Sequence, residues 1–308
     1  MAKSQRNKTI DLTDGQVKEY LARCVTTLTP EIQPSAVIYG DVIKACKAIA
    51  PKSVDLMIAD PPYNLSKSFN GNDFKKRTEE DYEAYTRAWI EASLPLLKPT
   101  ASVYVCCDWQ SGIIIGRVLQ DYFTVRNRIT WQREKGRGAA KNWKNGMEDV
   151  WFVTNGNDYT FNLDAVKVKK RVLAPYTEEG EPKDWFVEGG GKYRYTCPSN
   201  FWDDLTVPYW SMSENTVHPT QKPEKLIAKL ILASSNENDL VFDPFLGSGT
   251  TAVTAKKLSR RFLGIEREAK YCAISQYRLE KAEENPTIQG FENGVFLDRN
   301  EKPKGKKD

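Results

Sequence analysis

Val-Phe-Asp-Pro-Phe-Leu-Gly-Ser-Gly-Thr-Thr-Ala, residues 241–252, is the stretch that decides the fold of this chain. The short apolar run at its start predicts a buried strand, and the glycines at 247 and 249 predict a turn. The residues after the turn predict the start of a helix. Glycines let the backbone approach a ligand where a Cβ atom would clash. The spacing fits G-x-G-x-x-A, and Glu266 ends the next predicted strand, where a carboxylate can hold both ribose hydroxyls of a nucleoside-containing cofactor.

The carboxylate of Asp243 bears on which cofactor this turn accepts. It would repel a pyrophosphate but attract a cationic group, such as a sulfonium or an α-ammonium. A glycine turn kept only for packing, without any ligand, is the alternative that the stretch alone leaves open.

Around this stretch, short apolar runs alternate with amphipathic stretches, which predicts an α/β fold with a parallel sheet and helices on both faces. The predicted strands are 36–39, 54–59, 102–107, 124–131, 149–154, 159–161, 240–243 and 262–266. The predicted helices are 15–27, 79–97, 109–120, 223–234, 250–258 and 269–284. In the second of these, Tyr82, Tyr85, Trp89 and Leu96 recur at helical spacing, which predicts a stripe that faces the core. A ligand-stacking role for these aromatic residues is the alternative.

The rhythm is interrupted once, in the glycine-, proline- and tryptophan-rich stretch 133–217, which predicts an insertion made largely of loops. The expected organisation is an N-terminal appendage, two parts of one α/β domain on either side of the insertion, and a C-terminal tail. Their bounds are 1–35, 36–132, 133–217, 218–284 and 285–308.

Composition limits the classes of protein to consider. The 308 residues carry 45 basic and 41 acidic side chains, and the net charge of +4 permits a nucleic-acid partner without requiring one. Six scattered cysteines without a C-x-x-C pair, and one histidine, predict reduced thiols in a cytoplasmic protein and no metal site. No apolar run is long enough to cross a membrane, and no secretory signal opens the chain.

A second motif, Ala-Asp-Pro-Pro-Tyr-Asn at residues 59–64, follows the apolar run 54–59. Two prolines fix two φ angles and supply no N–H, so the turn is rigid and its carbonyls are free acceptors. Asp60 adds a carboxylate and Tyr63 a flat ring, a combination that suits an exocyclic amine on a flat base. A plain turn at the end of a strand is the alternative.

Together the two motifs resemble those of the DNA amino-methyltransferases, which transfer a methyl group from S-adenosylmethionine to adenine N6 or cytosine N4. In that family D-P-P-Y is the catalytic motif and the glycine turn is the cofactor motif. Here D-P-P-Y comes first and the glycine turn begins 180 residues later (243 − 63), an order that resembles the circularly permuted beta group. Tyr39-Gly40-Asp41 and the H-P-T-Q-K-P segment at 218–223 resemble further segments of the group, so that the resemblance covers about residues 36–283.

The resemblance implies a three-layer α/β fold with a mostly parallel twisted sheet of the S-adenosylmethionine-dependent methyltransferase type and an inserted target-recognition region. It implies that Asp60 and the Pro61 carbonyl hold the target amine, and that Tyr63 stacks on a base flipped out of the duplex. His218 is expected to be a structural hydrogen-bonding residue and not a base. The implied catalytic residues are Asp60, Pro61, Pro62 and Tyr63, and the implied cofactor-binding residues are Asp41, Asp60, Thr220, Lys222, Asp243, Phe245, Gly247, Ser248, Gly249, Thr250 and Glu266.

The DNA side is marked by a basic, glycine-containing segment that suits contacts with phosphates. Its candidate residues are Arg133, Lys135, Arg137, Lys141 and Lys144. A solvated basic loop is the alternative, in which case recognition would lie in the tryptophan-rich stretch 185–210. Residues 64–77 are a candidate for a mobile lid over the base pocket.

The sequence therefore predicts a site-specific DNA adenine-N6 methyltransferase that uses S-adenosylmethionine and double-stranded DNA. Adenine is favoured because D-P-P-Y begins with Asp, whereas Ser at this position is more usual for cytosine N4. A cytosine-N4 methyltransferase, a dinucleotide-dependent oxidoreductase and a non-catalytic DNA-binding module are the alternatives. The sequence also leaves open whether the protein forms a homodimer and whether a cognate restriction endonuclease acts on the same DNA site.

Overall fold

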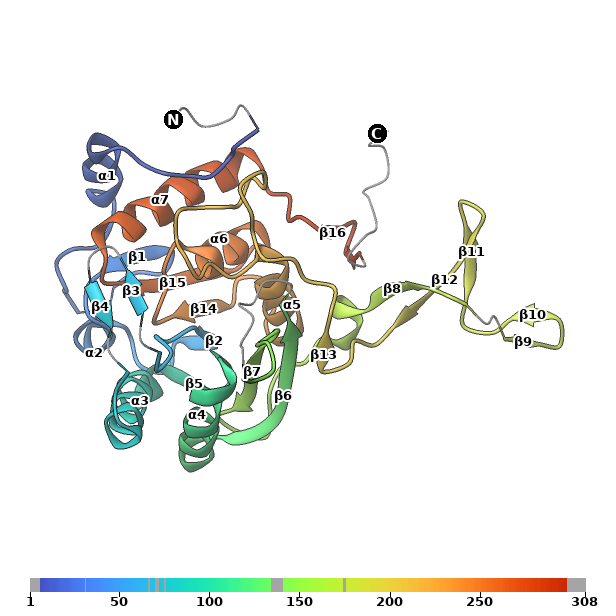
Figure 1. The fold of residues 1–308 in the computed structure, drawn as a ribbon, viewed down its shortest axis with the longest axis horizontal. Helices are drawn as coiled ribbons and strands as arrows, with labels where there is room; N and C mark the ends of the chain where they lie inside the picture. Colours follow the sequence, from blue (N-terminus) through green and yellow to red (C-terminus); the bar gives the residue numbers. More distant parts are fainter. Residues whose placement is uncertain are drawn as a thin grey trace.

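The computed structural model describes residues 6–30, 32–65, 67–69, 72–74, 76–133, 141–173 and 176–297. Within this part of the chain, eight strands form the central sheet in the order β1-β15-β14-β2-β5-β7-β6-β13 (Figure 1). Their bounds are β1 Ala36–Tyr39, β2 Val54–Ala59, β5 Leu97–Cys107, β6 Thr124–Gln132, β7 Met147–Thr154, β13 Phe201–Trp202, β14 Leu240–Asp243 and β15 Arg261–Glu266. Only β7 runs antiparallel to its neighbours in this sheet, so the prediction of a mostly parallel sheet is confirmed.

Helices cover both faces of the sheet, as the alternation predicted. Their bounds are α2 Val42–Ala45, α3 Glu79–Ser93, α4 Trp109–Tyr122, α5 Glu224–Ser234, α6 Thr250–Lys257 and α7 Ala269–Glu284. Met57 of β2 packs in the cluster of α2, α3 and α4, whereas its neighbours Leu56 and Ile58 pack in the cluster of α5, α6 and α7. Successive residues of a strand point to opposite faces, so a strand between two helix layers is apolar throughout.

The segment before β1 packs on the domain. Helix α1 (Asp14–Leu21) begins at Thr13, whose side chain accepts a hydrogen bond from the Gln16 N–H, and it places Tyr20 against α7. The prediction that this helix continues to residue 27 is wrong, because Val25 leaves it to pair beside β1: its N–H donates to the Val37 carbonyl at 2.9 Å.

The stretch 133–217 divides between the sheet and an extension. Strand β7 lies inside the central sheet between β5 and β6, so the boundary predicted at residue 133 does not coincide with the edge of the sheet. The predicted strand 159–161 is wrong: Tyr159 and Phe161 instead pack their rings on Phe152, with centroids 5.9 and 6.0 Å away.

Short strands, not the expected loops, build the extension that points away from the body in Figure 1. They are β8 Val168–Arg171, β9 Thr177–Glu178, β10 Glu181–Pro182, β11 Phe186–Glu188 and β12 Gly191–Thr196. The chain after α7 adds the hairpin β16 Phe291–Glu292 and β17 Val295–Phe296, which pairs with β8 at the base of the extension. A separate pair, β3 Lys67–Phe69 and β4 Asn72–Phe74, follows β2.

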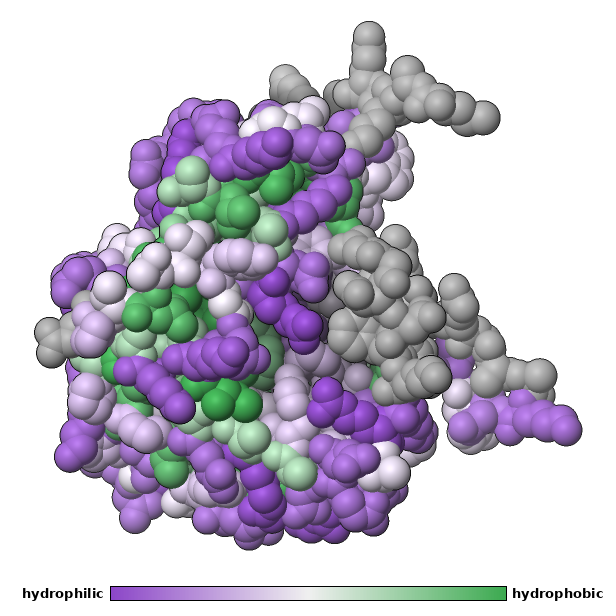
Figure 2. Space-filling model, turned by 90° about the vertical axis from the view of Figure 1, so that its left-hand side faces the viewer, coloured by the Kyte–Doolittle hydropathy of each residue, from purple (hydrophilic) through white to green (hydrophobic). Residues whose placement is uncertain are grey.

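The face shown in Figure 2 is largely hydrophilic, with hydrophobic residues in separate groups between the polar ones. Among the described residues, no helix combines the length and the apolar character needed to cross a membrane.

Candidate active site

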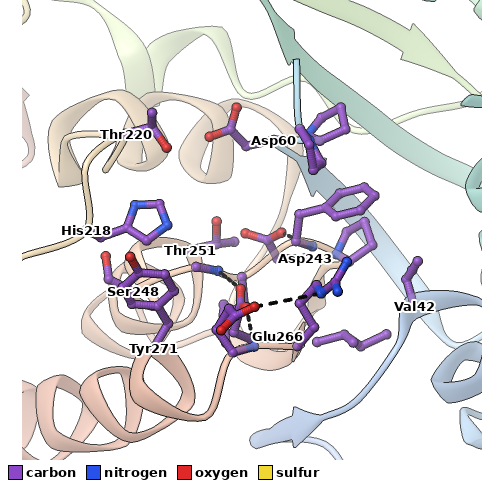
Figure 3. Close-up of a pocket in the computed structure, with 18 of the residues that line it drawn as sticks. Val42, Asp60, His218, Thr220, Asp243, Ser248, Thr251, Glu266 and Tyr271 are labelled. Atoms are coloured by element: carbon purple, nitrogen blue, oxygen red, sulfur yellow. Dashed lines mark hydrogen bonds and ion pairs between the residues drawn. The ribbon is translucent and has the colours of Figure 1, made fainter. Parts of the chain in front are cut away.

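The candidate active site is a cavity of about 290 Å³ at the carboxyl ends of the parallel strands (Figure 3). Four strand ends each supply a carboxylate to its wall: Asp41 follows β1, Asp60 follows β2, Asp243 ends β14 and Glu266 ends β15. Loops at this end of parallel strands form the usual ligand crevice of open α/β sheets. The fold thus brings together the two motifs that are 180 residues apart in the chain.

The glycine turn needs both of its glycines, but for different reasons. Gly247 lines the cavity with φ +55°, and a Cβ there would lie 3.1 Å from Nε2 of His218. Gly249 has φ +86° and faces away from the cavity, where a Cβ would lie 2.7 Å from Oγ of Ser275. Gly249 is not among the residues of the cavity wall, and its lack of a Cβ lets α6 start close to α7.

Glu266 supports this turn. Its Oε2 accepts a hydrogen bond from the Gly247 N–H at 2.8 Å, and its Oε1 accepts one from the Glu268 N–H at 2.7 Å. Burial raises the pKa of this carboxyl above its ordinary value. A carboxylate oxygen has further lone pairs, so Glu266 can still accept hydroxyl groups from the cavity while it holds the turn.

Asp243 lies deep in the cavity wall. Its Oδ1 accepts a hydrogen bond from the Phe245 N–H at 2.9 Å, and burial raises the pKa of its carboxyl to about 7. Because a low-dielectric surrounding disfavours a lone charge, a cation placed beside Asp243 would favour the ionised carboxylate. The site is thus suited to a positively charged ligand.

The D-P-P-Y turn carries a hydrogen-bonded charge cluster. The Tyr63 hydroxyl donates to Oδ1 of Asp60 at 2.9 Å, and Nζ of Lys222 donates to Oδ2 at 2.6 Å. Burial opposes the charge of Lys222, but the carboxylates of Asp60 and Glu148 outweigh it and keep the pKa of the lysine above its ordinary value. Lys222, placed by the resemblance among the cofactor residues, lines the cavity and also holds the Asp60 carboxylate in place.

Glu148 is the functional candidate that sequence reasoning missed. This buried side chain of β7 lies 3.5 Å from Nζ of Lys222, accepts a hydrogen bond from the Tyr63 hydroxyl at 3.4 Å, and forms an ion pair with Arg133. The only sequence signal was a Glu-Asp pair at the head of an apolar run. The ion pair places the guanidinium of Arg133, a candidate DNA-binding residue, beside this buried carboxylate.

His218 packs edge-to-face on Tyr271, with ring centroids 4.5 Å apart. Burial lowers the pKa of its ring to about 4, so the ring is neutral at physiological pH and is a weak base. Its Nδ1 is buried without a hydrogen-bond partner among the described residues, so the expected hydrogen-bonding role is wrong for this atom.

The remaining predicted residues divide between the cavity and its surroundings. The cavity wall includes, besides those named, Pro61, Pro62, Thr220, Phe245, Ser248 and Thr250. Tyr85 packs against the core cluster of Tyr82 and Trp89, as predicted, and also lines the cavity. The cavity wall further includes Val42, Ile43, Thr251 and Arg267, which the sequence did not single out. Lys141 and Lys144 are exposed, whereas Lys135 and Arg137 lie outside the described residues.

The candidate lid is described only in part. At its two ends the Asn64 side chain and the Arg77 backbone exchange hydrogen bonds of 3.1 and 2.8 Å. Much of the stretch between them lies outside the described residues. Among the described residues, no group of three potential metal ligands gathers at any point.

The geometry can be compared with known proteins. The family model described as DNA methylase (N6_N4_Mtase) matches residues 54–277, from β2 to α7. This chain belongs to the DNA methylase family. Membership removes the dinucleotide-dependent oxidoreductase alternative, which left D-P-P-Y without a role.

Two curated relatives of this DNA methylase cover most of its length. The Type II methyltransferase M.HpaI of Haemophilus parainfluenzae is 32% identical over 79% of this chain and 73% of its own. The DNA adenine methyltransferase YhdJ of Escherichia coli K12 is 34% identical over 81% of this chain and 84% of its own. Among solved structures, the M1.HpyAVI complex with SAM superposes with a TM-score of 0.54 at 24% identity, covering 79% of this chain and 98% of that chain.

Proposed function

We propose that this DNA methylase transfers a methyl group from S-adenosylmethionine to the exocyclic N6 amine of an adenine extruded from duplex DNA. The observation that carries the proposal is the Asp60 carboxylate, held from two sides by Tyr63 and Lys222, at the border of a cavity that contains Asp243 and Glu266. The relative YhdJ is named as an adenine methyltransferase, and an Asp opens D-P-P-Y here as the adenine assignment expects.

The chemistry of the cavity fits S-adenosylmethionine. Asp243 provides a buried carboxylate for a cationic group, Glu266 provides acceptors for ribose hydroxyls, and Phe245 with Tyr85 provides flat apolar surface for a purine. Gly247 leaves open the space that a Cβ would fill. When bound, the cofactor supplies a methyl group already activated by its sulfonium.

The residues around Asp60 act on the amine. Asp60 and the Pro61 carbonyl accept its two hydrogens, which turns the nitrogen lone pair out of conjugation with the ring and toward the methyl group. Lys222 and Tyr63 keep the Asp60 carboxylate in place, so that the acceptor needs no reorganisation during the transfer. No base is required before the N–C bond forms, since orientation of the amine supplies most of the rate enhancement. The carbon–sulfur bond of the methyl donor would break as the N–C bond forms, and the methylated nitrogen, now more acidic, would lose its extra proton afterwards to the solvent.

Further properties follow from the same proposal. The order of D-P-P-Y and the glycine turn supports membership of the circularly permuted beta group. Target recognition is assigned to 133–217, without β7, because the rest of that stretch lies outside the cofactor-binding part of the sheet. The type II name of M.HpaI supports a cognate restriction endonuclease as partner. A homodimer and a cytoplasmic location stay predictions.

The test is to express the chain in cells that lack adenine and cytosine-N4 methylation and to digest their DNA to nucleosides for mass spectrometry. We expect N6-methyladenine with the wild-type chain and none with Asp60→Ala, whose cofactor affinity should stay within a few-fold because Asp60 faces the amine. N4-methylcytosine as the product would overturn the adenine assignment. Normal methylation by Asp60→Ala would overturn the catalytic assignment.

A further inference from the structure

Beside the catalytic cavity lies a second, open groove with a volume of about 490 Å³ that no part of the proposed reaction uses. Four of its residues are large and apolar yet exposed: the exposed fractions are 93% for Trp143, 53% for Phe201, 45% for Trp109 and 37% for Met147. Its other wall residues are polar or small: Gln132, Asn142, Lys144, Asn145 and Gly146. Four large apolar side chains gathered and exposed in one groove indicate a ligand that covers them.

Two elements, β7 and α4, link the groove to the catalytic turn. Met147 and Glu148 are neighbours on β7 and point to opposite faces, so that Met147 lines the groove while Glu148 reaches Lys222 and Tyr63. Trp109 opens helix α4, and in the same helical turn Oγ of Ser111 accepts a hydrogen bond from the Asn64 N–H at 3.0 Å. Asn64 directly follows the catalytic Tyr63.

The side chains of the groove match the chemistry of a nucleobase. Indole and phenyl faces stack on any base, carboxamides such as those of Asn142, Asn145 and Gln132 hydrogen-bond to its edge, and a lysine suits its phosphate. The exposed charges of the adjoining described loop, Lys141 and Lys144, are both positive, whereas Glu148 and Asp149 are buried. This charge favours a polyanion over a neutral or basic protein surface.

We propose that the groove binds the orphaned base, the partner of the target adenine, after the target has left the duplex. The inference rests on the proposed function, because it requires an extruded adenine. That partner has already lost its Watson–Crick hydrogen bonds, so it costs less to unstack than any base that is still paired. Capture of the orphaned base prevents the target from returning to its partner and so holds the target in the catalytic cavity.

The test is a coupling experiment between Trp143 and the orphaned base. Binding of wild type and Trp143→Ala is measured on two duplexes, one with thymine and one with an abasic site opposite the target adenine. Base–aromatic stacking is worth about 1–3 kcal/mol per base. We therefore expect Trp143→Ala to weaken binding of the thymine duplex by about 5- to 150-fold and to leave binding of the abasic duplex unchanged. Trp143→Phe, which keeps a flat face, should restore most of the loss.

Tyr176→Ala is the matched control, since this tyrosine is also an exposed aromatic, with an exposed fraction of 76%, but does not line the groove. It should show no dependence on the opposite base. Equal weakening of both duplexes by Trp143→Ala would overturn the proposal, and so would a dependence on a flanking base instead of the opposite one. If Trp143→Ala left the binding of both duplexes unchanged, the proposal would also be overturned, and a protein would then be the expected occupant of the groove. Methyl transfer to adenine, measured in parallel, separates a failure of this inference from a failure of the proposed function.

Discussion

Replacing Glu266 with alanine tests the cofactor half of the site. The structure assigns this side chain two tasks, because its carboxylate holds the N–H groups of Gly247 and Glu268 and also faces the cavity. Hydrogen bonds to charged groups contribute about 1.5–3 kcal/mol, so loss of the ribose acceptor should raise the Kd of S-adenosylmethionine by about 10- to 150-fold. Glu266→Gln keeps one acceptor oxygen but turns an N–H₂ group toward a backbone N–H, and we expect an intermediate Kd.

The same substitution also lowers stability. It leaves two backbone N–H groups without their partner, which costs about 1–3 kcal/mol for each that stays buried. The measurement is therefore made in pairs: isothermal titration with the cofactor for Kd, and thermal unfolding without the cofactor for stability.

Asp55→Ala is the matched control for this experiment. Asp55 likewise accepts a backbone hydrogen bond, from the Leu240 N–H at 2.9 Å, and an ion pair from Lys98 at 2.6 Å, but it does not line the cavity. It should destabilise the fold and leave the Kd unchanged. A folded Glu266→Ala protein that binds the cofactor with wild-type affinity would refute the ribose role, and equal weakening in both variants would reduce the effect to a general loss of stability.

Three further predictions follow. Because burial raises the pKa of Asp243 to about 7, the ionised carboxylate that attracts a cationic cofactor is lost as the pH falls through 7. Titrations should show the Kd of the cofactor rising by up to about tenfold for each pH unit of decrease from pH 7 to 5.5, with release of a proton on binding. Asp243→Asn should remove this dependence on pH. Gly249→Ala places a Cβ at φ +86° against Ser275 and should lower the free energy of unfolding by about 1–3 kcal/mol, measured by chemical denaturation. Gly15→Ala, in a helix with open space around this residue, should not lower it. A Gly249→Ala protein as stable as the wild type would contradict the packing role. Replacing Lys141 and Lys144 together by glutamine should make the slope of log K against log salt concentration for duplex DNA shallower by about 0.9 for each phosphate that these lysines neutralise. The slope is measured by titration at several salt concentrations. An unchanged slope would mean that the two lysines belong to a solvated loop.

The sequence by itself determined the fold class and the two motifs of the site. Strands such as β2 and β14 are mostly apolar because both of their faces are covered by helices, so a short apolar run predicts them without any knowledge of their partners. The glycine turn and D-P-P-Y can be recognised in the sequence because each consists of consecutive residues, and their Gly and Pro residues determine which backbone conformations are possible. Asp60, Asp243, Gly247 and Glu266 could therefore be named in advance.

What only the tertiary structure decided depends on contacts between residues distant in the chain. Glu148 joins Tyr63 across 85 residues and Lys222 joins Asp60 across 162, and neither pairing has a local signature. Tyr85 packs against the core, as its helical spacing predicts, and also lines the cavity, and the period alone does not show that a ligand site borders this part of α3. β7 enters the sheet between β5 and β6, because the order of strands in a sheet depends on tertiary packing and not on their order in the sequence.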